Sequence, residues 1–328
     1  MEEIRETMQA ELNTAPPKRE REKKPRKKWH KNNVEVFIMA MIGAGFLFVF
    51  SYLPMVGAVL AFKKGDGYLN MMDAIFASPW AGFNNFRDIF LDSRFVPIMF
   101  NTLGFNLLRL ALTMPAPVVV AIMYNEVRHL RLKKGLQFFA YLPNFISIVV
   151  WVGLVHSLTD MQTGPINNLF QAMGSDPINF KGDPNYSWGM IIISDIIKGT
   201  GWGSIMYLAA IVGTNEELYD AADIDGANRF QKIWYVTIPV VMPLFVLQLV
   251  LSISSIMGND AASMLLWQTQ SNLDRTEVIS TFVLKEGINN MLYSYASAVG
   301  LFQSLVGMVL LVGSNWISKK INGSGVIF

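Results

Sequence analysis

The chain has 328 residues, of which 52% are hydrophobic and only 16% are charged. Soluble domains usually carry about 25% charged residues, so this composition favours a protein that crosses a membrane several times. The chain contains no cysteine, which excludes disulfides, thiolate catalysis and cysteine-ligated metal. Its net charge of +2 owes most to a basic stretch, KREREKKPRKKWHK, near its start. Beside an apolar segment, such a stretch is more typical of a topology signal or an anionic-lipid contact than of nucleic-acid binding.

In chain order, a basic tail over residues 1–33 precedes a first apolar run over 34–54. This run is longer than the apolar core of a signal peptide, which has about 7–15 residues, so we interpret it as a retained membrane span. Five more runs reach the length that a transmembrane helix needs, and they cover 98–125, 137–158, 189–212, 238–258 and 296–317. Pro115, Pro117 and Pro143 predict kinks in the second and third spans. The predicted fold class is an all-α polytopic membrane protein with six transmembrane helices.

The lysines and arginines that flank the spans predict the orientation of the chain. They gather in the loops after the second and fourth spans and at the C-terminus, as Arg128, Arg131, Lys133, Lys134, Arg229, Lys232, Lys319 and Lys320. The positive-inside rule therefore places both termini in the cytoplasm. We expect four parts: a cytoplasmic tail over 1–33, a first helix with an external loop over 34–97, a transmembrane core over 98–317 and a cytoplasmic tail over 318–328.

Motifs for catalysis and metal binding are missing from the sequence. The three histidines form no H-x-x-x-H pair, and no G-x-x-x-x-G-K-[ST] run could cradle a nucleotide. We therefore predict no enzyme activity and no metal site, so any energy source must be a partner or an ion gradient. Arg109, Asp195 and Lys198 lie within the predicted spans, where each ionised group costs roughly 2.5–3.5 kcal/mol. Asp195 and Lys198 are three residues apart on one helix face and are predicted to form an intramembrane ion pair.

The loop after the fourth span, TNEELYDAADIDGANRFQKIWYVTIP over 214–239, has the pattern of a short acidic helix. Thr214 and Glu217 have the spacing of a capping box, and Gly226 fits a C-terminal turn with positive φ. One face of this helix is built on alanines, so another surface could approach its backbone closely. A helix that rests on a membrane would instead combine lysines and arginines with bulky apolar groups. The pattern therefore favours a protein partner.

These residues resemble the EAA loop of binding-protein-dependent ABC importer permeases. That loop has Glu-Ala-Ala, three residues, Gly, nine residues and then Ile-x-Leu-Pro. Here DAA, Gly226 and VTIP stand at the same spacing, with aspartate in place of the glutamate. The resemblance implies a coupling helix that docks on a cytoplasmic ATPase subunit. The residues that it assigns to this contact are Glu217, Asp220, Ala221, Ala222, Asp225, Gly226 and Pro239.

Further stretches extend the resemblance over most of the chain, among them QFFAYLPNFISIVVWVGLVHSL and KGTGWGSIMYLAAIVG. They look like permeases of the maltose-type carbohydrate uptake class, which carry oligosaccharides and polysaccharides through a six-helix type I (MetI-like) core in a bacterial cell membrane. The resemblance implies that partner ATPase subunits bind ATP and Mg²⁺, and that this chain binds no cofactor. It also implies a second homologous permease, identical or different, and an extracytoplasmic solute-binding protein.

If sugars cross the membrane here, aromatic and hydrogen-bonding side chains are expected near the middle of the spans. The candidates for this path are Tyr141, Asn144, Ser147, Trp151, Trp202, Ser252, Ser255 and Asn259. The same residue types also anchor helices at membrane interfaces or hold neighbouring helices together, so each candidate has a structural alternative.

Two other functions remain open at this point. A secondary transporter would need no ATPase and would make the spacing of the loop accidental, but it usually needs more acidic groups along its path than this chain has. A non-transporting membrane sensor or scaffold would tolerate a bulky residue at Gly226.

Overall fold

The computed structural model describes residues 31–322 and divides into two units, Met1–Met55 and Val56–Phe328. The described part of the first unit is helical. It contains α2 (Lys31–Leu47), a π-helical turn over Phe48–Tyr52 and the start of the 3₁₀ segment Leu53–Phe62. Most of the predicted tail over 1–33 and the end of the predicted C-terminal tail lie outside the described residues.

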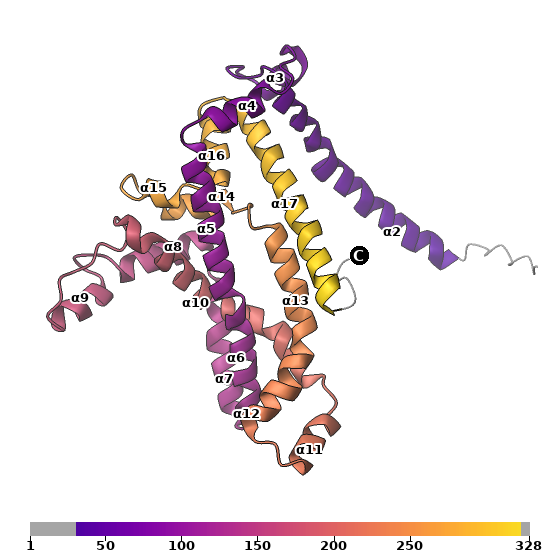
Figure 1. The fold of residues 1–328 in the computed structure, drawn as a ribbon, viewed down its shortest axis with the longest axis vertical. Coiled ribbons are helices and arrows are strands. Elements are labelled where there is room, and N and C mark those ends of the chain that lie inside the picture. The colour runs from indigo at the N-terminus through magenta and orange to yellow at the C-terminus, as the bar shows by residue number, and fades with distance from the viewer. Residues whose placement is uncertain (1–30, 323–328) are drawn as a thin grey trace, which may run out of the picture. The chain divides into compact units, whose positions relative to one another are not determined.

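The second unit is built from helices and their connections (Figure 1). Its α-helices are α3 (Met71–Ala77), α4 (Asn84–Leu91), α5 (Phe95–Thr113), α6 (Pro115–Glu126), α7 (Leu130–Tyr141), α8 (Ile148–Leu158), α9 (Pro165–Ala172), α10 (Pro184–Val212), α11 (Glu217–Ile224), α12 (Arg229–Lys232), α13 (Ile238–Ser254), α14 (Ala261–Trp267), α15 (Leu273–Thr276), α16 (Ile279–Leu284) and α17 (Tyr293–Asn322). The part of the chain that the structure describes has no β-strand, only one isolated bridge between Lys63 and Trp80. The predicted all-α class is confirmed.

Four helical segments are long and apolar enough to cross a membrane, and two bent pairs pass the same test together. The four are Val34–Phe62, Phe95–Glu126, Arg229–Ser254 and Tyr293–Lys320. The bent pairs are Leu130–Phe145 with Ile148–Leu158, at 105°, and Pro184–Val212 with Glu217–Ile224, at 71°. Counting each pair as one span gives six, which agrees with the predicted number.

The third predicted span is broken rather than continuous. Pro143 lies in a 3₁₀ turn, and the backbone then extends through Ile146 and Ser147, with ψ of 131° and 148°. Ser147 begins α8 by accepting a hydrogen bond from the N–H of Val150 at 3.4 Å. A proline that lacks an N–H, followed by a new N-cap, explains why one apolar run folds as two helices. The bend predicted at Pro143 is present. At 105° it separates two helices and is not a kink within one helix.

Helix α10 lies at the centre of the second unit and packs against α5, α6, α7 and α13. Gly201 allows the closest of these approaches, because a Cβ there would lie 2.0 Å from the carbonyl oxygen of Ala140 at the end of α7. Small residues bring membrane helices together in this way. One buried cluster, made of Ala121, Tyr207, Ile211 and Val241, joins α6, α10 and α13.

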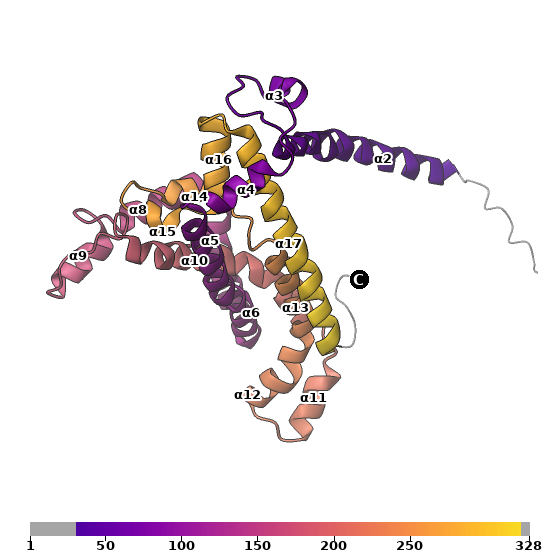
Figure 2. The same cartoon turned by 45° about the horizontal axis from the view of Figure 1, so that its top comes forward.

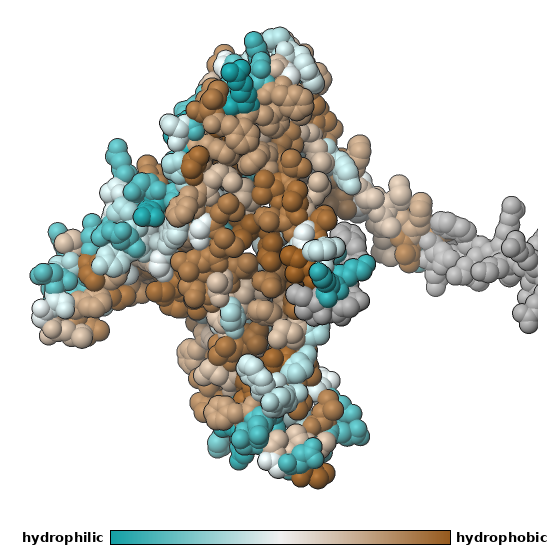
Figure 3. Space-filling view, viewed as in Figure 1, coloured by the Kyte–Doolittle hydropathy of each residue, from teal (hydrophilic) through white to brown (hydrophobic). Residues whose placement is uncertain are grey.

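Polar residues gather at opposite ends of this unit. Figures 1 and 2 place α11 and α12 at one end and α3, α4 and α16 at the other. Figure 3 shows hydrophilic residues at both of these ends and hydrophobic residues over the helices between them. The distribution fits a unit whose middle lies in lipid and whose ends meet water.

Candidate functional site

The helix of the 214–239 loop begins later than the capping-box spacing predicts. Helix α11 starts at Glu217, and no side chain caps it from Glu216. The hydroxyl of Thr214 instead donates to the carbonyl of Ala210 at 3.1 Å, in the last turn of α10. The predicted capping box is therefore wrong. Helix α10 ends directly before this loop, and the free carbonyl of Ala210 accepts the hydrogen bond of the threonine. Asn215 accepts from the N–H of Glu217 at 3.1 Å and satisfies one of the free amides there.

The other end of α11 closes as the sequence predicts. Gly226 has φ of 73°, its N–H donates to Asp223 at 3.1 Å, and the next N–H, of Ala227, donates to Ala222 at 2.9 Å. These are the two bonds of a Schellman motif, which satisfy the last carbonyls of the helix. A side chain at Gly226 would meet nothing within 4 Å, so the need for glycine comes from the backbone conformation.

Helix α11 buries none of its residues within the chain. The predicted coupling residues Glu217, Asp220, Ala221, Asp225 and Gly226 are exposed, and Ala222 is half-buried. Pro239 is exposed in the first turn of α13, where a missing N–H costs little. Two large apolar side chains stand beside them, Ile224 at 86% exposure and Phe230 at 81%. Exposed apolar groups rimmed by charge are typical of a surface that binds a protein.

Polar contacts hold the loop together and attach it to the membrane helices. The hydroxyls of Tyr219 and Thr237 lie 3.0 Å apart, and Thr237 is buried at the start of α13. Within the loop, Lys232 pairs with Asp223 at 2.5 Å. Arg229 binds both the carboxylate and the carbonyl oxygen of Glu126, the last residue of α6. A cation at the C-terminus of a helix is favoured by the free carbonyls and the dipole there.

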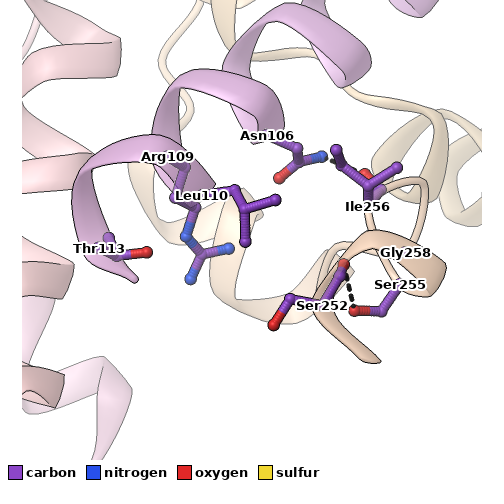
Figure 4. Close-up of a pocket in the computed structure, with 8 residues that line it drawn as sticks. All are labelled: Asn106, Arg109, Leu110, Thr113, Ser252, Ser255, Ile256 and Gly258. Carbon is purple, nitrogen blue, oxygen red and sulfur yellow. Dashed lines mark hydrogen bonds between the residues drawn. The ribbon is translucent and has the colours of Figure 1, made fainter. Parts of the chain in front are cut away.

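A second candidate site is a pocket of about 200 Å³ between α5 and the end of α13 (Figure 4). It is lined by Asn106, Arg109, Leu110, Thr113, Ser252, Ser255, Ile256 and Gly258. A larger cavity of about 500 Å³ shares Arg109 and Thr113 with it and is lined further by Pro117, Asn144, Ile148, Asp195, Lys198, Gly199, Thr200, Asp260 and Ser263. The side chain of Arg109 therefore faces two neighbouring spaces.

The charged residues at membrane depth pair differently from the prediction. Asp195 forms its ion pair with Arg109, whose Nε lies 2.8 Å from the carboxylate. Lys198 instead donates to the carbonyls of Pro143 at 2.9 Å and Ile146 at 2.5 Å. The predicted Asp195–Lys198 pair is thus wrong, because the break between α7 and α8 frees carbonyls that a lysine can satisfy. The ammonium also lies 5.5 Å from the ring of Trp151.

Three of the predicted path residues line these cavities. Ser252 and Ser255 face the smaller pocket, and Asn144 faces the larger cavity. Asn259 lies next to the smaller pocket and exchanges two hydrogen bonds with Asn106, at 2.7 and 2.9 Å.

The other path candidates lie outside the cavity linings. Ser147 caps α8, and Trp151 donates to the hydroxyl of Ser194 at 2.7 Å. Trp202 is 49% exposed and packs edge to face on Phe145. Tyr141 ends α7 and is half-buried.

Asn106 and Thr113 line the smaller pocket although the sequence pattern did not predict them as path residues. Together with Arg109 they lie at spacings of three and four, so they form a polar stripe on the single apolar helix α5. That stripe is readable in the sequence. Asp260 and Ser263 were missed because they belong to a loop and a short helix that bear no such pattern.

A charge cluster lies at the end of the unit opposite α11. Arg94 donates to Asp92 through its backbone and side chain and reaches Glu286 at 2.5 Å. Tyr295 donates to Asp92 at 3.0 Å. The hydrogen bonds from Arg94 hold the pKa of the Asp92 carboxyl below its usual range, although partial burial opposes this shift. The cluster joins α17 to the connection between α4 and α5.

Comparison with known proteins assigns the chain to a family. Residues 113–323 match the family described as "Binding-protein-dependent transport system inner membrane component". Protein LplB of Bacillus subtilis (strain 168) is 35% identical over 291 residues, which cover 89% of this chain and 90% of LplB. The polygalacturonan/rhamnogalacturonan transport system permease protein YteP of the same organism is 32% identical and covers 89% of each chain.

Solved structures agree with this assignment. A chain from the crystal structure of a bacterial ABC transporter involved in the import of the acidic polysaccharide alginate is 32% identical, with a TM-score of 0.81, over 89% of this chain and 97% of that chain. A second structure of the alginate transporter, bound to a pentasaccharide-loaded periplasmic protein, gives the same TM-score. The fold and the site thus define a multi-pass membrane permease subunit, which is not an enzyme. The chain belongs to the binding-protein-dependent transport system inner membrane components of ABC importers.

Proposed function

We propose that this chain is a permease subunit of an ATP-driven importer that carries a carbohydrate into the cytoplasm. The observation that carries the proposal is α11, an acidic helix with a small face that is closed by Gly226 and exposed at one end of the second unit. In this function α11 is the coupling helix and docks on an ATPase subunit. Glu217, Asp220, Ala221, Ala222, Asp225 and Gly226 form the contact.

The proposed assembly has four kinds of subunit. Two ATPase subunits bind ATP and Mg²⁺, a second homologous permease completes the path, and a solute-binding protein delivers the sugar outside the cell. The end with α11 then faces the cytoplasm, as do both chain termini. Arg128, two residues after Glu126 in the connection before α7, lines one pocket with Arg229 and Lys232 and supports this orientation, since positive charge favours the cytoplasmic side.

The division into four parts follows the same orientation. We propose a cytoplasmic tail over 1–33, a first helix with an external loop over 34–97, a permease core over 98–317 and a cytoplasmic tail over 318–328. A carbohydrate substrate is supported by the relatives, whose names include polygalacturonan, rhamnogalacturonan and arabinooligosaccharides. The cavities lined by Asn144, Thr113 and Ser252 offer the hydroxyl and amide groups that a sugar would bind.

The first test is purification of the tagged chain from its native membrane in mild detergent, followed by mass spectrometry of the proteins that accompany it. The native chain should retain an ATPase subunit. Gly226→Trp should lose it, because an L-residue with positive φ costs about 1–2 kcal/mol and the bulky ring stands on the docking face. If the native chain purifies alone and stable, the proposal fails and gradient-driven transport becomes the better explanation.

Gly174→Trp is the matched control. Gly174 also has a positive φ, 82°, and also has nothing within 4 Å of its missing Cβ, but it follows α9, away from the 214–239 loop. This variant should therefore suffer the same backbone strain and keep the ATPase subunit. Loss of the subunit from both variants would mean that general destabilisation, and not the docking face, explains the result.

A further inference from the structure

Arg109 is placed at the middle of a membrane span with part of its hydrogen-bonding capacity unused. It lies near the centre of Phe95–Glu126, where a charged side chain is costly unless it is paired. Asp195 pairs with its Nε at 2.8 Å. Among the described residues, no protein group accepts a hydrogen bond from either terminal amino group of Arg109, and the side chain is 40% exposed. Figure 4 shows the guanidinium projecting from α5 into the space that Ser252 and Ser255 also line.

The two spaces beside this guanidinium differ in the charged residues that line them. Within the described residues, Arg109 is the single charged residue that lines the smaller pocket. In the larger cavity, Arg109 and Lys198 oppose Asp195 and Asp260. Asp260 accepts from the N–H of Ala262 at 3.2 Å and begins α14, but this hydrogen bond leaves its negative charge in place. The four charges of the larger cavity therefore cancel, whereas the described residues that line the smaller pocket carry one positive charge and no negative charge.

We propose that Arg109 binds the carboxylate of a uronic acid unit, so that the carbohydrate carried by this permease is acidic. A guanidinium presents two parallel N–H donors that match the two oxygens of a carboxylate, and the pair strengthens in a site with little water. In the smaller pocket such a carboxylate meets no acidic side chain among the described lining residues. This inference rests on the proposed function, because it names the substrate class of the same transport path.

The remaining groups of the pocket suit the rest of such a sugar unit. The side-chain amide of Asn106 is already bonded to Asn259 and to the carbonyl of Ile256 at 2.7 Å, so it shapes the wall. The hydroxyl groups of Thr113 and Ser252 have no oxygen or nitrogen partner among the described residues and can bond to sugar hydroxyls. A pocket of about 200 Å³ is small for a whole oligosaccharide, so neighbouring sugar units would extend into the larger cavity.

The test uses the complete importer, purified with its ATPase subunits and binding protein and reconstituted in lipid vesicles. The readout is stimulation of ATP hydrolysis by oligosaccharides from polygalacturonate, alginate and glucuronoxylan, each beside its carboxyl-reduced form. At least one acidic oligosaccharide should stimulate at a concentration about tenfold or more below that of its reduced form, as expected for a lost charge-assisted interaction. Equal or better stimulation by the reduced forms, or by neutral oligosaccharides alone, would overturn the proposal, and so would no stimulation by any acidic oligosaccharide.

Variants assign the preference to this chain rather than to the binding protein, which stays the same throughout. Arg109→Gln combined with Asp195→Asn keeps the cavity free of an unpaired carboxylate. This double variant should lose most of the acidic preference while any stimulation by the reduced forms persists. Arg131→Gln, on the exposed surface of α7, is the control and should keep the preference. A double variant that keeps the full preference would refute a role for Arg109.

The two proposals fail in different ways. If the proposed function is wrong, the native chain brings no ATPase subunit with it and no importer can be assembled. If only the acidic substrate is wrong, the importer assembles and hydrolyses ATP, but a carboxylate on the sugar gives no advantage.

Discussion

The 214–239 loop and the cavity around Arg109 both collect polar residues on an apolar chain. The contacts that hold these residues in place differ greatly in sequence separation. In the loop, Tyr219 meets Thr237 across 18 positions and Lys232 meets Asp223 across nine. Around the cavity, Asn106 meets Asn259 across 153 positions, and Arg109 meets a carboxylate on a helix that begins at Pro184. A local contact constrains one segment, whereas a long-range contact depends on the whole helix arrangement being correct.

The largest expected effect is a change that breaks this arrangement directly. Gly201→Ala should lower the melting temperature of the purified complex strongly, because the new methyl group would lie 2.0 Å from the Ala140 carbonyl and α10 would have to move from α7. Overpacking of this kind typically costs about 1–3 kcal/mol. Gly199→Ala, two residues earlier on α10, meets nothing within 4 Å and should be neutral or slightly stabilising. Equal melting temperatures for the two variants would contradict the close approach of α7 and α10.

The next effect concerns the broken span alone. Lys198→Met should remove the donor that binds the carbonyls of Pro143 and Ile146. A fully buried acceptor left without a partner costs about 1–3 kcal/mol, and these two carbonyls are partly buried, so each should cost less. We expect transport to fall by about tenfold, while the ATPase subunit still co-purifies because the 214–239 loop is untouched. Lys198→Arg keeps a donor and should restore part of the transport. A methionine variant with normal transport would show that the bend needs no support from α10.

The features that could be predicted from the sequence are those fixed by residues close together in the chain. The left-handed turn at Gly226 follows from the glycine and its neighbours, and the α10-to-α13 loop contains the whole coupling pattern. The prediction for Thr214 was wrong because a carbonyl at the end of the preceding helix competes for its hydroxyl. The prediction for Lys198 was wrong because its acceptors become available only where the third span breaks. Helical spacing on α10 placed Asp195 and Lys198 together, but the fold brought Arg109 of α5 to the carboxylate. The number of spans and part of the cavity wall, namely Asn144, Ser252 and Ser255, could be predicted, whereas the pairing of the charges beside that wall could not.

The smallest expected effect tests whether the loop acts as one body with the membrane helices. Arg229 binds the last residue of α6, and its side chain is 61% exposed, so the ion pair contributes little to stability, about 0–1 kcal/mol. If the contact transmits motion from α11 to α6, its loss should alter coupling more than folding. We expect Arg229→Glu and Glu126→Arg each to lower the number of substrate molecules transported per ATP by about two- to fivefold. The melting temperature should barely change in either variant.

The double variant decides between transmission and a passive surface contact. Combining Arg229→Glu with Glu126→Arg restores opposite charges across the same gap and should recover most of the transport per ATP, although the bond from Arg229 to the Glu126 carbonyl is lost. Lys232→Glu, which opposes Asp223 inside the loop, is the matched charge reversal that leaves α6 unaffected. Its double variant with Glu126→Arg should show no recovery, because the two residues are not partners. Additive losses in the Arg229–Glu126 pair would mean that the loop reaches the membrane helices mainly through Tyr219 and Thr237, whose contact is partly buried and local.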